Sequence, residues 1–262
     1  MAETRQALYL FGQLFRRFLA QSHKGSLLGV TWLFFAPLLQ MAVYTVVFGM
    51  IFDGRYEGVE DQTEFDYALG IFLSLTLFQV LAQVLGSSPG AVLGQPNLVK
   101  KVKMPLEVIA PAHVAVALFH FLIGLVLVFG FMVYLGKPFT ASFLLFPVLF
   151  APVVLMAFGL GWLLAALGVF LRDIQNMVAP LSMILLYSSG IFYSTSMVPP
   201  SIWTFLRFNP LIHVVEQSRH LLLWGTPVEW AGVWYAYGFG AVLLVLGYWT
   251  FAKLKEAFAD VV

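Results

Sequence analysis

The feature that most constrains this chain is a series of long apolar runs that are separated by short polar loops. Each run is long enough for a helix to cross a bilayer, which takes about 20 residues, whereas the strands of a membrane barrel alternate over about 10. Hydrophobic residues make up 61% of the sequence and charged residues only 10%. Soluble domains carry about 25% charged residues. These runs therefore predict an all-α polytopic membrane protein.

Counting the runs predicts six transmembrane helices in a single transmembrane domain over residues 1–262. Residues 1–27 are expected to form an interfacial helix, 28–252 the six spans, and 253–262 a cytoplasmic tail. The small residues at 86–90 should bend or break the second span near its inner end. Pro147 and Pro152 should kink the fourth span. The expected spans cover about 30–52, 67–93, 108–135, 142–170, 177–193 and 230–251.

The loop QPNLVKKVKMPLE, at 95–107, sets the orientation of the chain because it holds Lys100, Lys101 and Lys103. Basic residues next to spans are retained on the cytoplasmic side. Six spans then place both termini on that side of the cytoplasmic membrane. Such a loop could dock an acidic partner or anionic lipid headgroups. In this topology ten of the 14 basic residues face the cytoplasm: Arg5, Arg16, Arg17, Lys24, Lys100, Lys101, Lys103, Arg172, Lys253 and Lys255.

The first 25 residues do not read as a secretory signal, because Arg16 and Arg17 follow the short apolar patch instead of preceding it. Helical spacing of the apolar residues predicts an amphipathic helix that lies in the cytoplasmic interface. The alternative is a soluble helix that caps the bundle. The residues that form the apolar face are Leu8, Phe11, Phe15 and Phe18.

Between residues 194 and 229 the pattern changes, because prolines cut the chain into pieces at about 201–208 and 211–224. At about 1.5 Å per residue, neither piece can span a core of about 30 Å. A span through 211–224 would also move the C-terminal lysines outside. We therefore expect a re-entrant pair of half-helices on the outer side between spans five and six, which suggests a gate or the mouth of a pathway. Two helices lying flat on the outer surface are the alternative. The breaks fall at Pro199, Pro200, Asn209, Pro210 and Pro227.

Ionisable residues inside membrane segments are costly, so each one is a functional candidate. On the second half-helix His213, Glu216 and His220 stand at i, i+3 and i+7, and Arg219 can pair with Glu216. The group could line an outer gate, could be an internal salt bridge, or could relay protons. In the third span His113 and His120 share a helical face. Hydrogen bonding to neighbouring helices is favoured over a metal pair, since no third ligand stands nearby.

Signatures of catalysis are missing from the sequence. It contains no phosphate-binding Gly-x4-Gly-Lys-Ser/Thr motif, no His-Glu-x-x-His, no Gly-x-Ser-x-Gly and no cysteine. We therefore expect no catalytic residues and no metal site. Energy for transport would come from a gradient or from a partner.

Several stretches together resemble a known family. They are the amphipathic start, Ser26–Gly29 with Trp32 and Pro37, Val47-Phe48 at the end of the first span, Asn97–Lys101 with Met104-Pro105, Arg172-Asp173, and the run NPLIHVVEQSR from Asn209 to Arg219. In this order the chain resembles the permease subunits of type-2 ABC exporters for polysaccharide, which include the O-antigen, teichoic acid and capsule permeases. The resemblance extends over nearly the whole chain.

That resemblance implies a half-transporter of the bacterial inner membrane, in contact with membrane lipid and not with nucleic acid. A second copy of the chain and two copies of a separate ABC ATPase subunit would complete it. The ATPase would bind ATP and Mg, so this chain would hold no cofactor. The substrate would be a lipid-linked polysaccharide. ATPase docking is implied for Arg16, Arg17, Lys100, Lys101, Lys103, Arg172 and Asp173, and an outer gate for Pro199, Pro200, Asn209, Pro210, His213, Glu216, Arg219 and His220.

Three other functions stay open at this point. The chain could be an ABC-2 permease for a drug or a small lipid. It could be a proton-coupled secondary carrier that works through Glu216, His213 and His120, although no internal repeat halves are evident. It could also be a membrane-embedded enzyme, for which His113 or His120 would have to be essential.

Overall fold

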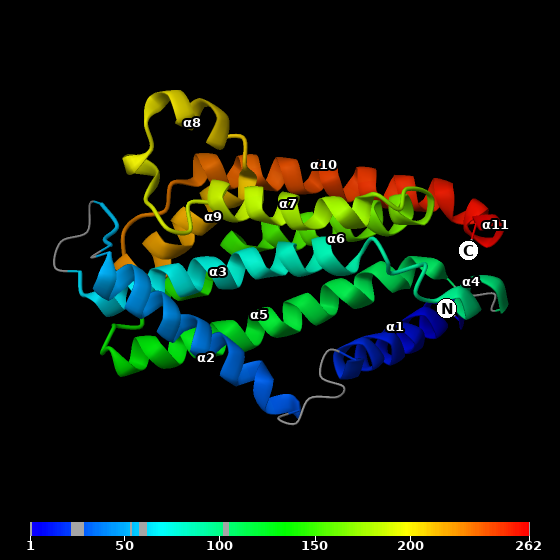
Figure 1. Cartoon of the computed structure of the whole chain (residues 1–262), viewed down its shortest axis with the longest axis horizontal. Coiled ribbons are helices and arrows are strands. Elements are labelled where there is room, and N and C mark those ends of the chain that lie inside the picture. The colour runs from blue at the N-terminus through cyan, green and yellow to red at the C-terminus, as the bar shows by residue number, and fades with distance from the viewer. Residues whose placement is uncertain (1, 22–28, 53, 58–61, 102–104, 262) are drawn as a thin grey trace.

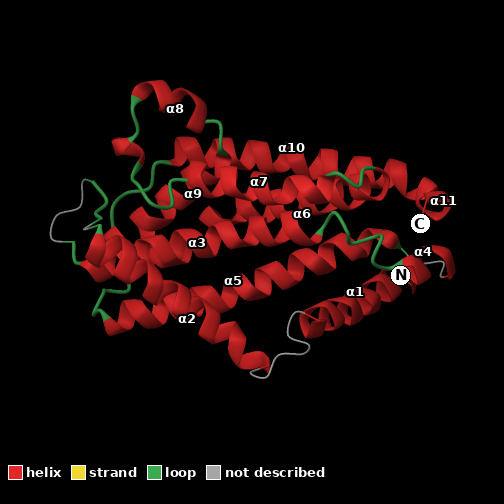
Figure 2. Ribbon diagram, viewed as in Figure 1, coloured by secondary structure: helices red, strands yellow, loops and turns green. Residues whose placement is uncertain are grey.

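A computed structural model of the chain describes residues 2–21, 29–52, 54–57, 62–101 and 105–261. Within those ranges every regular element is a helix (Figure 2). The long helices are α1 (Ala2–Gln21), α2 (Trp32–Tyr44), α3 (Glu64–Ser87), α5 (Ile109–Tyr134), α6 (Phe146–Phe170), α7 (Ile174–Ser188) and α10 (Trp230–Leu254). The shorter ones are α4 (Pro96–Lys101), α8 (Pro200–Leu206), α9 (Pro210–Arg219) and α11 (Phe258–Val261). Two π-helical segments, η2 (Thr45–Ile51) and η6 (His220–Trp224), extend α2 and α9, and single 3-10 turns are η1 (Gly29–Thr31), η3 (Leu106–Val108), η4 (Ala141–Leu145), η5 (Thr195–Met197) and η7 (Lys255–Ala257).

Helices α3, α5, α6, α7 and α10 lie side by side along the longest axis of the molecule, with α3 at the centre, and α2 crosses this bundle obliquely (Figure 1). Helices α2, α5, α6, α7 and α9 all contact α3. Helix α8 lies at one end of the bundle, whereas α4, α11 and the start of α1 lie at the other. We call these the α8 end and the α4 end.

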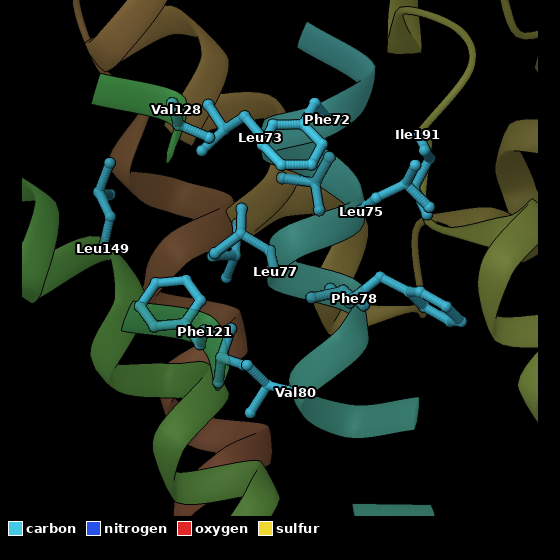
Figure 3. Close-up of a cluster of buried hydrophobic side chains, with 14 of the residues drawn as sticks. Phe72, Leu73, Leu75, Leu77, Phe78, Val80, Phe121, Val128, Leu149 and Ile191 are labelled. Atoms are coloured by element: carbon cyan, nitrogen blue, oxygen red, sulfur yellow. The ribbon is translucent and has the colours of Figure 1, made fainter. Parts of the chain in front are cut away.

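Burial of most of α3 explains its composition, because a helix with little solvent or lipid face can be apolar around nearly its whole circumference. Of its most apolar 18-residue stretch, 83% is buried, against 17–39% for the other four candidate spans. Phe72, Leu73 and Leu77 of α3 pack with Phe121 of α5 and Leu149 of α6 in the core (Figure 3). The remaining helices cover α3 and turn apolar side chains outward.

Close packing of α6 on α10 depends on small residues. A Cβ added at Gly159 would meet the backbone of Leu243 at 2.5 Å, and one at Gly247 would meet the carbonyl of Gly159. Lipid tails are as apolar as the helices, so association in a membrane relies on such close contact of backbones. These two glycines therefore allow the contact that joins the last helix to the bundle.

Both ends of α3 follow from local sequence. At its start the Thr63 side chain accepts a hydrogen bond from the Asp66 backbone N–H, and the Asp66 carboxylate accepts one from the Thr63 N–H. This capping box satisfies two N–H groups that would otherwise lack a partner. Lys137, in the turn after α5, forms an ion pair with Asp66 at 2.7 Å. At the other end, the break predicted at 86–90 is confirmed, because α3 ends at Ser87 and turns follow.

Among the described residues, five helical stretches are long and apolar enough to cross a membrane, and they correspond to predicted spans one to four and six. They are Trp32–Ile51, Glu64–Ser87, Leu106–Tyr134, Ala141–Phe170 and Trp230–Ala257. The predicted fifth span corresponds to α7, which has only 15 residues. The structure thus supports a multi-pass helical membrane protein with five candidate spans and one shorter apolar helix.

Three details of the prediction differ from the structure. Pro147 lies in the first turn of α6, where its missing N–H would have no partner in any case, and only Pro152 is inside the helix. The second span was expected to reach residue 93, six residues beyond its observed end. The last span was expected to end at residue 252, whereas α10 continues to Leu254, and η7 and α11 follow in the segment expected to be a cytoplasmic tail.

Candidate functional site

The residues singled out in the sequence form two groups at opposite ends of the bundle. Those expected to dock an ATPase lie at the α4 end, and those expected to form a gate lie at the α8 end (Figure 1). No residue is shared between the two groups, so each is described by itself.

At the α4 end, α1 packs along α5 through its apolar face. Leu14 and Phe18 are buried, and the Phe18 ring stacks on His113 at 4.0 Å between ring centroids. This contact explains His113 as part of a packing interface between two helices. The predicted amphipathic helix is thus present, with its apolar face covered in part by the protein.

The polar face of α1 presents Arg16 and Arg17 as exposed side chains. Arg17 Nη2 donates to Gln95 Oε1 at 2.7 Å, which joins α1 to the predicted basic loop. Arg172 and Asp173 are exposed in the short connection from α6 to α7. Lys100 and Lys101 belong to α4, and Lys103 lies outside the described residues.

At the α8 end the prolines act as helix boundaries. Pro199 and Pro200 start α8, and Pro210 is the first residue of α9. Asn209 caps α9, because its side-chain oxygen accepts the Leu211 N–H at 2.9 Å. Its amide nitrogen donates to Ser188 at 2.8 Å and to Ser189 at 3.1 Å, which fixes the start of α9 against the end of α7.

The two short helices differ in their surroundings. Every residue of α9 except His213 is buried, and α9 contacts α3, α6 and α10. None of the residues of α8 is buried. The alternative in which both pieces lie flat on a surface is therefore wrong for α9, which packs inside the bundle.

Arg219, at the end of α9, is fully buried at 0% exposure and is held by Glu216 of the same helix and by three groups from distant parts of the chain. It forms an ion pair with Glu216, as the i, i+3 spacing predicted. It also donates to the Gly190 carbonyl at 2.6 Å, the Tyr193 carbonyl at 3.3 Å and the Ser74 hydroxyl at 3.1 Å. An ionised group in such a place is retained only when it is paired and hydrogen-bonded.

Glu216 accepts hydrogen bonds from the segment after α7 through its other carboxylate oxygen. The donors are the hydroxyls of Ser194, at 3.0 Å, and Thr195, at 3.3 Å, together with the Thr195 N–H at 3.4 Å. His220 Nε2 lies 3.8 Å from the same oxygen. Several donors therefore bind the carboxylate. A proton relay would instead require a carboxyl group that is available to take up and release a proton.

Two tyrosines complete this arrangement, and the sequence did not indicate them. Tyr56 donates to the Ile191 carbonyl at 2.7 Å, and Tyr67 donates to the Phe192 carbonyl at 2.8 Å. The Arg219 guanidinium lies over the Tyr56 ring at 4.3 Å. Burial raises the pKa of the Tyr56 phenol, so it stays a neutral donor.

We call this group of residues the brace: Tyr56, Tyr67, Ser74, Ser194, Thr195, Glu216 and Arg219. It fastens the 190–195 turn to α3, to α9 and to the loop between η2 and α3. Gly190 sits in this turn at φ 65°, a conformation that favours glycine. The brace makes the connection from α7 to α8 a fixed part of the bundle.

The remaining predicted histidines have ordinary hydrogen-bond partners. His213 Nε2 lies 2.9 Å from the Arg207 carbonyl, and His220 Nδ1 lies 2.5 Å from the Thr226 hydroxyl. His120 Nδ1 pairs with the Gln83 side-chain amide. In the described part of the chain no cluster of three or more metal-binding side chains occurs.

The sequence profile of the ABC-2 type transporter family matches residues 9–223, which extend from within α1 into η6. The chain belongs to this family. Both groups of predicted residues fall within the match.

Three similar proteins are named for the polysaccharides that they handle. An O-antigen export system permease protein RfbA from Klebsiella pneumoniae is 26% identical over 91% of this chain and 89% of its own length. One from Myxococcus xanthus is 25% identical over 79% of this chain and 77% of its own length. A polysialic acid transport protein KpsM from Escherichia coli is 24% identical over 88% of this chain and 87% of its own length.

Proposed function

We propose that this chain is the permease half of an ATP-driven ABC exporter that moves a lipid-linked polysaccharide of the O-antigen or capsule type across the cytoplasmic membrane. The observation that carries the proposal is the near full-length similarity to proteins named as O-antigen and polysialic acid export proteins. The membership of the ABC-2 type transporter family and the multi-pass helical fold agree with it.

In the proposed assembly two copies of the chain pair and two copies of a separate ATPase subunit bind at the α4 end. Support comes from Arg16, Arg17 and Arg172, whose exposed cations lie where an acidic surface could bind them. The hydrogen bond between Arg17 and Gln95 makes α1 and the basic loop one surface. Movement of the ATPase would then reach the bundle through α1, which packs on α5.

We further propose six crossings, with α7 as the fifth. Its 15 residues correspond to about 22 Å at 1.5 Å per residue, less than the core of about 30 Å. The 189–193 segment that follows adds length, and the brace satisfies its carbonyl groups as membrane depth requires. The start of α1 and α11 at one end of the bundle agree with an even number of crossings.

Helix α9 would enter the membrane from the outer face, and α8 would lie at that face as a movable flap. The brace lowers the free-energy cost of burying these two charges, since Glu216 and Arg219 neutralise each other inside the bundle. An apolar cavity of about 790 Å³ between α7 and α8, lined by residues such as Ile184, Tyr187 and Ile202, separates the flap from the bundle. Closing or widening this space would gate the outer end.

The proposal can be tested in a strain that lacks this gene. If the chain exports a polysaccharide, deletion should leave lipid-linked glycan inside the cell, and mass spectrometry of extracted lipids should find it. The wild-type gene should remove the accumulated lipid, whereas a copy paired with an ATPase that cannot hydrolyse ATP should not. A deletion strain with normal surface glycan and no accumulated lipid would contradict the proposal and favour a drug or small-lipid permease.

A further inference from the structure

A cavity of about 430 Å³, with a mostly apolar lining that includes four amide or imidazole side chains, lies between α2, α3 and α5, apart from both groups of residues described above. Gln40 of α2, Gln79 and Gln83 of α3 and His120 of α5 line it. Helix α2 crosses α3 and α5 obliquely beside this region (Figure 1). Its volume falls within the range of about 300–1,000 Å³ that is typical of ligand sites.

The two α3 glutamines of the cavity lie in the half of that helix nearer the α4 end. Gln83 and Gln79 precede the end of α3 at Ser87 by four and eight residues, or about 6 and 12 Å at 1.5 Å per residue. All three helices that form it are candidate membrane spans. Polar side chains are therefore concentrated at a depth where the chain is otherwise apolar.

Partners within the described chain account for only some of these polar groups. The Gln83 amide and His120 Nδ1 are 2.9 to 3.0 Å apart, and the Gln40 amide is 3.4 Å from the Tyr44 hydroxyl. The exposed Gln79 amide makes no hydrogen bond to the described residues. An amide in an apolar medium without a partner costs free energy, so a polar group from outside the chain is expected at Gln79.

The chemistry of the lining selects the ligand. Amides both donate and accept hydrogen bonds, as hydroxyl groups do. The cavity has no charged side chain, and Phe72 and Phe121 add apolar ring surface. A phosphate or carboxylate would find no cation there. A neutral ring that carries several hydroxyls matches both the amides and the aromatic faces.

We infer that this cavity binds a neutral, hydroxyl-rich sugar ring of an amphipathic lipid, with Gln79 as a direct hydrogen-bond partner. The inference rests on the proposed function and adds to it that the sugar held at this depth is uncharged. Helix α2 forms one wall, so its displacement would open or close the site to the surrounding lipid.

The test uses the full-length wild-type protein in phosphatidylcholine nanodiscs with a photoreactive octyl glucoside, whose alkyl chain carries a diazirine. Illumination should label peptides of α3 and α5 in the wild type. Gln79→Leu should lower this labelling at least fivefold, because the amide is lost while the added apolar side chain suits a membrane segment. Gln175→Leu makes the same change on α7, outside the cavity, and should leave the labelling unchanged.

A probe of the same alkyl chain with a sulfate headgroup separates sugar recognition from binding of the chain alone. Equal labelling by both probes, or equal labelling of wild type and Gln79→Leu, would overturn the inference. These results are distinct from failure of the proposed function, which the accumulation of lipid-linked glycan in the deletion strain decides separately.

Discussion

At the scale of single residues, Arg219 stands out because it is a charged side chain that is fully buried. Its guanidinium is fully buried, and it links α9 to α3 and to the turn after α7. Removing one partner of a buried ion pair leaves the other charge uncompensated, which is costlier than never having built the pair. The brace should therefore be sensitive to loss of either charge and tolerant of losing both.

Arg219→Met should destabilise the protein by about 3–5 kcal/mol, because Glu216 would then be buried without its countercharge. Thermal or denaturant unfolding in nanodiscs, followed by tryptophan fluorescence, would measure it. Arg207→Met is the matched control, since Arg207 is exposed on the neighbouring segment and has no ion pair in the described chain. The double variant Glu216→Gln/Arg219→Met should cost less than the sum of the single changes. Strict additivity would show that the pair does not act as a unit.

Tyr56→Phe should cost about 1–3 kcal/mol, since it leaves the buried Ile191 carbonyl with one partner fewer while the ring remains. Tyr9→Phe, at a side chain that is 70% exposed on α1, is the control and should change little. The measurement is the same unfolding experiment. Identical behaviour of the two variants would mean that the Tyr56 hydroxyl does not contribute to the brace.

At the scale of helices, composition and spacing predicted the features that depend on one helix alone. Apolar length located α2, α3, α5, α6 and α10, and the i, i+3 spacing located the ion pair of Glu216 with Arg219. The position of α9 inside the bundle could only be argued from its short length. Its burial depends on neighbours that are distant in the sequence.

The brace shows what a single sequence cannot reveal. Tyr56 lies in a loop and reaches a carbonyl 135 residues away, and Ser74 meets Arg219 across 145 residues. A loop tyrosine and a serine in an apolar run have many ordinary explanations. Ser74 indicated the brace better than Tyr56 did, because a hydroxyl inside a long apolar helix needs a hydrogen-bond partner. Its own helix also supplies such a partner, however, at the Gly70 carbonyl.

Contact of α6 with α10 should be the helix interface that is least tolerant of added volume. Gly159→Ala places a Cβ within 2.5 Å of the Leu243 backbone, so the two helices must move apart. We expect a loss of folded protein, measured as a smaller monodisperse peak in size-exclusion chromatography and a lower unfolding temperature. Gly130→Ala on α5 meets nothing within 4 Å and serves as the control. Equal yields of both variants would show that α6 and α10 are less closely fixed than the structure indicates.

At the scale of the whole molecule, the function depends on which end of the bundle faces the cytoplasm. The exposed arginines and α4 are at one end and α8 is at the other (Figure 1). In the proposed topology the basic residues place the first end in the cytoplasm. If α7 did not cross, α8 would be on the cytoplasmic side and the C-terminus outside. Whether α7 crosses the membrane therefore decides the topology of the whole chain after α6.

The chain contains no cysteine, so a single introduced thiol can be labelled without background. Ser201→Cys, exposed on α8, should react with a membrane-impermeant maleimide in intact spheroplasts. Ala259→Cys, exposed on α11, should react only after permeabilisation. Six crossings require this pair of results, whereas five require the opposite pair, because a missing fifth crossing inverts everything after α6. The reversed labels would place the flap on the ATPase side and remove the physical basis for an outer gate.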